Sequence, residues 1–184
     1  MAISDEKILQ AAVDVISERG YAGATTKQIA SRAGINEVTL FRRFGNKKNV
    51  MRSVVEREAK RLGDLNIRYS GDLVADLIQI VEVYQELMQR RGRVMLMLMS
   101  EIPRQPDLLE IAQVPQAQAR RFASILTRYQ AEGQLIQEPP MLALGSLIGP
   151  IFSASMLRSL EPDLARNLAD AAQLVDRFLH GRRA

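Results

Sequence analysis

A turn centred on a glycine separates two short helical segments near the N-terminus, and this spacing narrows the possible folds of the chain considerably. Thr25 and Gln28 have the spacing of a capping box, which predicts that a helix begins here. Gly34 ends that segment, and Asn36 can cap a second segment that runs to Phe44. A glycine-containing turn of about three or four residues between two such helices is the helix-turn-helix pattern.

The second segment of this pair, predicted over residues 37–44, has one buried side. Leu40 and Phe44 coincide on a helical wheel and are expected to pack on the preceding helices. The other side chains point outward or lie on the flanks: Glu37, Val38, Thr39, Phe41, Arg42 and Arg43. Arginine can bond guanine through two hydrogen bonds or grip phosphate, and apolar side chains can contact thymine methyl groups. The pattern therefore favours a helix that enters the major groove of DNA, with a solvated basic helix face as the alternative.

Positive charge is concentrated in the same part of the chain. Residues 1–70 hold 13 Lys and Arg residues against 8 Asp and Glu residues, a net charge of +5, whereas the remainder holds 12 against 13. Lys47 and Lys48 follow Asn46, the expected cap of a further helix, whose positive N-terminal end attracts phosphate. This segregation predicts a module for nucleic acid, or for another anionic surface, attached to a neutral domain.

The rest of the chain is predicted to be helical, because apolar residues recur at helical spacing and no strand pattern occurs. A fourth helix is expected from the Asn46 cap to Gly63, with helical spacing that extends to Tyr69. Residues 94–99 are apolar on every side and are expected to be buried. Pro115 is expected to interrupt a helix, and Pro162 to lie in the first turn of the last one.

The composition argues against catalysis and metal binding. The chain has no Cys and a single His, His180, so neither a disulfide nor a nitrogen- and sulfur-ligated metal site is expected. Neither a phosphate-binding P-loop nor a G-x-G-x-x-G sequence occurs, and the carboxylates are scattered over expected helix faces. We therefore predict a protein that is not an enzyme and has no metal or cofactor, with a helical acid–base enzyme as the alternative.

The most apolar run, MLALGSLIGPIFSASML, extends from Met141 to Leu157 and contains Pro150. It is shorter than a typical membrane span of about 20 residues, and we interpret it as a buried helix. The N-terminus, MAISDEKILQAA, has acidic residues where a signal peptide is positively charged. A cytoplasmic protein without membrane contact is predicted, and binding of the basic end to anionic lipid is the alternative.

The stretch TTKQIASRAGINEVTLFRRFGNKKNVM resembles the DNA-binding domain of the TetR family of bacterial transcriptional regulators. The family pattern is close to T-T-x-x-I-A-x-x-A-G-V-S-x-x-T-L-Y-x-H-F-x-x-K-x-x-L. This sequence agrees with it at Thr26, Ile29, Ala30, Ala33, Gly34, Thr39, Leu40, Phe44 and Lys47. It departs at Phe41, where the family usually has Tyr, and at Arg43, where His is common.

The resemblance implies a sequence-specific, dimeric repressor that binds palindromic double-stranded DNA and is released by a small ligand. The implied fold has nine or so helices: an N-terminal three-helix helix-turn-helix module joined to an antiparallel helical domain for ligand binding and dimerisation. The last two helices would pair with a second subunit. The expected domains are residues 1–46 for DNA binding, 47–70 as a linking helix and 71–184 for ligand and partner. The expected DNA contacts are Thr26, Lys27, Asn36, Glu37, Val38, Thr39, Phe41, Arg42, Arg43 and Lys47.

The ligand is predicted to be mostly apolar and to bind among the helices between Leu73 and Tyr129. Methionine side chains adapt to irregular space, so a methionine-rich apolar stretch can line a pliable pocket. No acidic cluster occurs inside this stretch, which disfavours a strongly cationic ligand. The expected ligand contacts are Tyr84, Met88, Arg91, Leu96, Met99 and Phe122. The alternative is that these side chains only fill the core.

Overall fold

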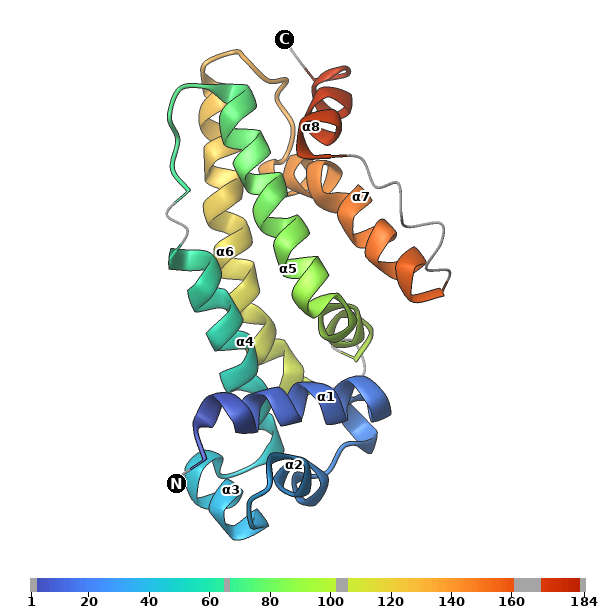
Figure 1. Cartoon of the computed structure of the whole chain (residues 1–184). Helices are drawn as coiled ribbons and strands as arrows, with labels where there is room; N and C mark the ends of the chain where they lie inside the picture. The colour runs from blue at the N-terminus through green and yellow to red at the C-terminus, as the bar shows by residue number, and fades with distance from the viewer. Residues whose placement is uncertain (1–2, 65–66, 102–105, 161–169, 183–184) are drawn as a thin grey trace. The chain divides into compact units, whose positions relative to one another are not determined.

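The structure is a computed structural model that describes residues 3–64, 67–101, 106–160 and 170–182, and within these ranges it contains only helices and loops. The prediction of an all-α chain is confirmed (Figure 1). The described ranges hold eight helices: α1 (Asp5–Gly23), α2 (Thr26–Ala33), α3 (Glu37–Phe44), α4 (Lys47–Asp64), α5 (Leu73–Glu101), α6 (Pro106–Ala131), α7 (Pro140–Leu160) and α8 (Ala171–Leu179).

The chain divides into two compact units that do not follow the order of the sequence. The first unit consists of Met1–Arg61 together with Val94–Pro115, and the second of Leu62–Arg93 together with Gln116–Ala184. Helices α5 and α6 therefore each contribute residues to both units. The domain boundaries expected from the sequence, 1–46, 47–70 and 71–184, stay a prediction.

The helix boundaries of the first unit are set by the local signals found in the sequence. The Thr25 hydroxyl accepts from the Gln28 backbone N–H at 3.2 Å, and the Gln28 side chain accepts from the Thr25 N–H at 3.0 Å, so the capping box is confirmed. Gly34 adopts a left-handed φ of 74°, which costs other residues conformational strain. The Asn36 side chain then caps α3 by accepting from the Val38 N–H at 2.9 Å.

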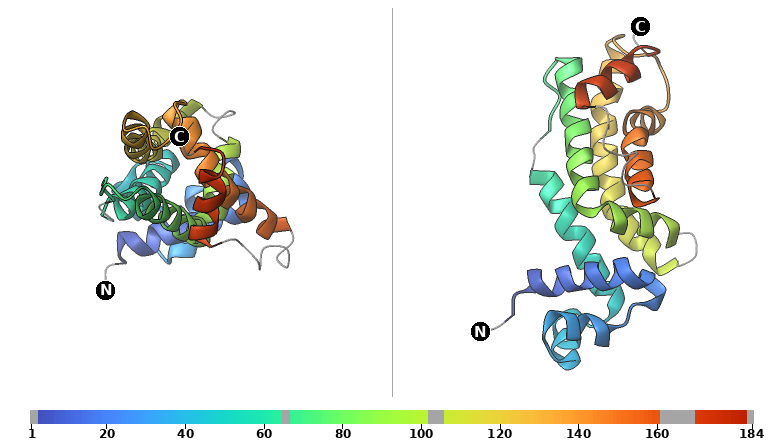
Figure 2. Two further views of the ribbon diagram at one scale, coloured as in Figure 1. Left: turned by 90° about the horizontal axis from the view of Figure 1, so that it is seen from above. Right: turned by 45° about the vertical axis from the view of Figure 1, so that its right-hand side comes forward.

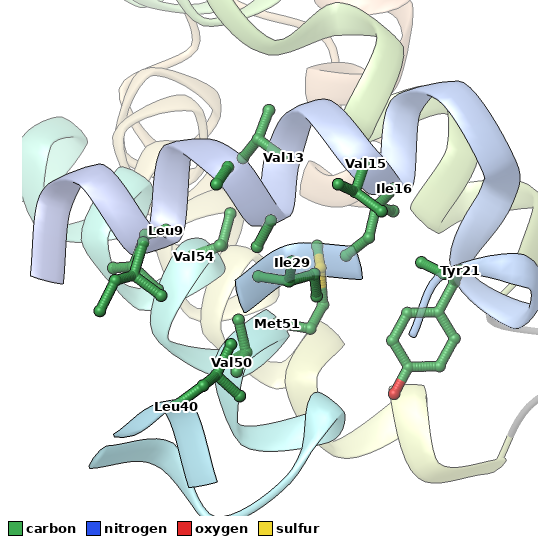
Figure 3. Close-up of a cluster of buried hydrophobic side chains, with 14 of the residues drawn as sticks. Leu9, Val13, Val15, Ile16, Tyr21, Ile29, Leu40, Val50, Met51 and Val54 are labelled. Atoms are coloured by element: carbon green, nitrogen blue, oxygen red, sulfur yellow. The ribbon is translucent and has the colours of Figure 1, made fainter. Parts of the chain in front are cut away.

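The core of the first unit lies between α1, α2, α3 and α4 (Figure 3). Ile29 and Leu40 are fully buried in it, and burying each such side chain stabilises the fold by about 1.5–3 kcal/mol. Leu108 and Ile111, from the beginning of α6, are buried in the same cluster, and Met95 from α5 packs against it half-buried. The end of α5 and the beginning of α6 are therefore part of the fold of the helix-turn-helix module.

The second unit is built on the remaining parts of α5 and α6, which run antiparallel and side by side (Figures 1 and 2). The Tyr84 and Phe122 rings meet edge to face, with centroids 5.7 Å apart. Asp76 is fully buried, and its carboxylate accepts from the Tyr129 hydroxyl at 2.6 Å and from the Ser70 N–H at 2.8 Å. These bonds fasten the segment that precedes α5 to the end of α6.

Two helix ends differ from the prediction. Helix α4 ends at Asp64, and the backbone of residues 67–70 is not helical, so the expected extension to Tyr69 is wrong. The Ser70 N–H bonds the Asp76 carboxylate instead of a carbonyl of a preceding helical turn. The last helix begins at Ala171, because the Asp170 side chain caps it by accepting from the Gln173 N–H at 2.8 Å. Pro162 lies outside the described residues.

Two expectations about α5 and α6 are also wrong. Pro115 lies inside α6 and the helix continues through it. Buried residues on both sides, such as Ile111 and Phe122, supply packing that offsets the missing hydrogen bond and the ring clash, a cost of about 3 kcal/mol. Met99 belongs to the run expected to be buried, yet its side chain is 52% exposed. This end of α5 packs through Met95, so part of its apolar surface stays open in the single chain.

Candidate nucleic-acid interface and ligand site

Helix α3 presents an outward surface whose centre is Val38, Phe41 and Arg42. Leu40 is fully buried on the inner side, whereas Val38 is 72% and Phe41 46% exposed. The Arg42 guanidinium is exposed and bonds no other described residue. Exposed apolar side chains beside an unpaired arginine can make the thymine-methyl and guanine contacts that the major groove offers.

Arg43 and Lys47 also belong to the expected set of DNA contacts, but the structure holds both against α1 or the residues beside it. The Arg43 Nη1 donates to the carbonyl of Ile3 at 2.6 Å and to Asp5 Oδ1 at 3.1 Å. The Lys47 Nζ donates to the carbonyls of Tyr21 at 2.7 Å and Ala24 at 2.8 Å.

The Lys47 ammonium therefore caps the end of α1, where carbonyl groups lack helical partners. It also lies 4.5 Å from the centroid of the Tyr21 ring, within the range of a cation–π contact. Partial burial lowers the pKa of Lys47, while the charge of Glu101 acts in the opposite direction. A phosphate contact by Lys47, as the sequence predicts, would require these bonds to α1 to break.

Thr26 and Glu37 connect the two helices of the helix-turn-helix. The Thr26 hydroxyl donates to Glu37 Oε1 at 2.6 Å, which joins the first residue of α2 to the first residue of α3. Lys27 is exposed and bonds no other described residue, so it is available to an anionic partner. Thr39 is half-buried, and the Asn36 side chain is engaged in capping α3.

An acidic residue of α6 pairs with two cations of α4. Glu110 Oε2 lies 2.9 Å from the Lys48 Nζ and 2.8 Å from the Arg52 Nη2. The hydrogen bond from Lys48, together with the charges of Arg52 and Lys48, lowers the pKa of Glu110. This pairing could not be predicted from the sequence, because no local signal connects residues so far apart in the chain.

The helix-turn-helix occurs inside a segment that a family profile identifies. Residues 8–54 match the profile described as bacterial regulatory proteins, tetR family. Residues 68–183, more than half of the chain, match a tetracyclin repressor-like C-terminal domain.

The chain belongs to the TetR family. It is accordingly a DNA-binding transcription regulator, and the resemblance found in the sequence is confirmed.

Known relatives are members of the same class. The HTH-type transcriptional regulator YvkB of Bacillus subtilis is 26% identical over 134 residues, which cover 72% of this chain and 71% of the relative. The transcriptional repressor Rv3405c of Mycobacterium tuberculosis is 33% identical over 88 residues, 48% of this chain and 42% of that protein. In a solved complex of SmeT with triclosan, the SmeT chain is 25% identical with a TM-score of 0.75, and the match covers 98% of this chain and 91% of that one.

TetR-family regulators respond to small molecules, and the structure brings together some of the expected ligand contacts. Tyr84, Met88 and Phe122 are buried in the second unit, where the Tyr84 and Phe152 rings also approach, with centroids 6.3 Å apart. Burial raises the pKa of Tyr84 to about 12, and its hydroxyl bonds no other described residue. Arg91, half-buried, lies in the same unit.

The other two expected ligand contacts, Leu96 and Met99, belong to the first unit. Leu96 is half-buried and Met99 is exposed. Phe152, by contrast, was not identified from the sequence. The available signal was weak: an aromatic residue in the otherwise aliphatic run from Met141 to Leu157.

Proposed function

We propose that this regulator is a dimeric repressor, and that a small, mostly apolar ligand releases it from a palindromic operator in the cytoplasm. The observation that carries the DNA-binding part is Arg42, an exposed arginine on α3 without a described partner, flanked by the exposed Val38 and Phe41. Arg42 reads guanine, Val38 and Phe41 contact thymine methyl groups, and Lys27 binds phosphate. Arg43 and Lys47 contribute to DNA binding indirectly, because their bonds to α1 and the residues beside it hold α3 and α4 in place within the module.

Dimerisation through α7 and α8 is supported by the outward face of α7. Met141, Leu142, Met156 and Leu157 are between 47% and 64% exposed, and the run from Met141 to Leu157 has no charged residue. Among the described helices, α7 alone is long and apolar enough to span a membrane, with a mean hydropathy of 1.6 over Pro140–Arg158. A second copy of the chain covers this face in the proposed dimer. A twofold dimer then matches the symmetry of a palindromic operator.

The proposed ligand site is the aromatic and methionine cluster of the second unit, formed by Tyr84, Met88, Phe122 and Phe152. An apolar ligand packs among these side chains, and the Tyr84 hydroxyl donates a hydrogen bond to it, since a buried hydroxyl without a partner is costly. Arg91 accommodates an anionic group where the ligand has one. The binding of triclosan, an apolar phenol, by the relative SmeT supports a ligand of this class.

Coupling between ligand and DNA runs along α5 and α6 in this proposal. Helix α5 carries Tyr84 and Met88, helix α6 carries Phe122, and both helices extend into Val94–Pro115, which folds with the helix-turn-helix module. A ligand that changes the packing of Tyr84 against Phe122 therefore acts on the module through two continuous helices. Reorientation of the module moves the two recognition helices of a dimer out of register with successive major grooves.

The test is a selection from random duplexes with the purified protein, followed by release with a panel of apolar compounds. We expect an inverted repeat, bound as a dimer, with an affinity that falls steeply as salt rises. Leu142→Glu should produce a monomer in analytical ultracentrifugation and weaken operator binding. Recovery of no inverted repeat contradicts the operator proposal. A Leu142→Glu variant that stays dimeric contradicts the proposed dimer interface. Salt-dependent binding of anionic vesicles in preference to DNA supports the alternative, in which the basic end of the chain binds anionic lipid.

A further inference from the structure

Glu37 is an acidic side chain on the recognition helix of a basic module. It follows the cap of α3 directly, is half-buried, and neighbours Val38, the most exposed of the large apolar side chains described. Its only described partner is Thr26, whose hydroxyl donates to Oε1 at 2.6 Å. The second carboxylate oxygen of Glu37 therefore has no described donor.

The bond to Glu37 also determines what Thr26 can do. A threonine hydroxyl has one proton to donate, and here that proton is directed at a carboxylate, in a short, charge-assisted hydrogen bond. While this bond holds, Thr26 has no proton for a DNA phosphate and retains only acceptor capacity. Thr26 is thus better suited to hold the Glu37 side chain than to grip the DNA backbone.

A carboxylate on the outward side of this helix is restricted to one kind of DNA group. Phosphates repel it, as do the acceptor atoms of guanine and thymine in the major groove. The remaining donors are the amino groups of cytosine and adenine. In adenine the amino group lies beside the N7 acceptor, which repels the second carboxylate oxygen, whereas cytosine has no such neighbour.

We propose that Glu37 is a specificity-determining residue that accepts a hydrogen bond from the N4 amino group of a cytosine in each half-site, with Thr26 as its positioning residue. This inference rests on the proposed DNA-binding role of α3. It differs from the roles of Arg42 and Lys27, because it assigns base preference to an acidic side chain and removes Thr26 from the expected direct DNA contacts.

The experiment is a random-duplex selection with the full-length wild type and three variants: Glu37→Gln, Thr26→Val and Thr26→Ser. The wild type should select cytosine at one position of each half-site. Glu37→Gln keeps the shape and the acceptor for Thr26, but an amide pairs with adenine through two hydrogen bonds. The preference at that position should change from cytosine to adenine by about tenfold or more, while the other positions keep their preferred bases.

The Thr26 variants test the positioning role. Thr26→Val should weaken the preference for cytosine at the position that Glu37 contacts and at no other position. Thr26→Ser retains the hydroxyl and should keep the preference of the wild type. The affinity of Thr26→Val for duplexes without the selected cytosine should stay unchanged. A phosphate contact by Thr26 would instead make Thr26→Val bind every duplex more weakly by a similar factor with its base preference unchanged, and that result would overturn the positioning role.

The outcomes separate this inference from the proposed function. Wild type and Glu37→Gln could select the same inverted repeat, with the variant binding every duplex more tightly. This result would overturn the cytosine contact and leave the operator proposal intact. No inverted repeat for the wild type overturns both. A change from cytosine to adenine at a single position per half-site supports both.

Discussion

The Lys47 Nζ lies 2.7 Å from the carbonyl oxygen of Tyr21, so a lysine at the start of α4 caps the end of α1. A second carbonyl, that of Ala24, accepts from the same ammonium at 2.8 Å. These bonds satisfy backbone groups that the end of a helix leaves without partners. They also give Lys47 a structural role in a segment whose positive charges otherwise suit DNA.

Lys47→Ala should therefore lower the stability of the protein. Loss of charged hydrogen bonds to partly buried carbonyls should reduce the free energy of unfolding by about 1–2 kcal/mol. The measurement is chemical unfolding followed by circular dichroism. Lys27→Ala is the matched control, since Lys27 is exposed without a described partner, and it should weaken DNA binding at unchanged stability. Equal stability of the two variants would contradict the capping role of Lys47.

Arg42→Ala should reduce discrimination between operator and scrambled DNA by about 1–3 kcal/mol, because the lost contact is to a base edge. Its unfolding free energy should equal that of the wild type, since no described residue bonds the guanidinium. Arg43→Ala provides the contrast. It removes bonds to Ile3 and Asp5 and should lower stability as well as DNA affinity. The measurement is the affinity of both variants for operator and for scrambled DNA. Unchanged discrimination in Arg42→Ala would refute the contact between Arg42 and a base.

Glu110→Gln should strengthen DNA binding. The carboxylate pairs with Lys48 and Arg52, and removal of its negative charge weakens both ion pairs and its repulsion of nearby phosphate. Affinity for any duplex should rise several-fold, and the slope of log affinity against log salt should become steeper by about one to two per subunit. Glu86→Gln is the control, because it removes the same charge from an ion pair with Arg90 in the second unit. Identical binding by the two variants would mean that only net charge matters.

Tyr84 should make stability depend on pH in the alkaline range. Its pKa of about 12 in the folded protein exceeds the ordinary value of 10.0, because burial disfavours the phenolate. Above pH 10 the unfolded chain releases a proton that the folded chain retains, so the free energy of unfolding falls as pH rises. The contribution is fully present below pH 10 and is lost by about pH 12.

Tyr84→Phe should remove this contribution, which amounts to about 3 kcal/mol. Unfolding measured at several pH values should give curves for wild type and variant that diverge between pH 10 and about 12. Parallel curves would show that Tyr84 titrates normally. The same variant should bind apolar ligands more weakly, since it lacks the hydroxyl that the proposed ligand accepts from.

Local signals in the sequence were sufficient to predict the helix-turn-helix. Each cap acts over about three residues, as between Thr25 and Gln28, and Gly34 is needed because of a single backbone angle. The outward direction of Val38 and Arg42 follows from the helical repeat once Leu40 is recognised as buried. None of these features depends on distant parts of the chain.

Tertiary structure decided where the end of α5 and the beginning of α6 belong. The apolar run 94–99 indicates burial but does not specify a neighbour, and Met99 is in fact exposed. Leu108 and Ile111 join the core of α1–α4 because of contacts between segments far apart in the sequence. The hydrophobicity of a segment favours its burial but does not specify which other segment covers it. The division into units could therefore not be predicted from periodicity.

Charge, caps and glycine positions are properties of single short segments, so the basic, capped helix-turn-helix of the TetR type could be predicted without knowledge of the packing. Which charged side chains of that module bond within the protein, by contrast, depends on the packing of its helices. Arg42 and Lys47 lie close together in the sequence and carry the same charge. Lys47 meets the carbonyl groups at the end of α1, whereas Arg42 meets no described residue, and this difference depends on how α1 packs against α3 and α4.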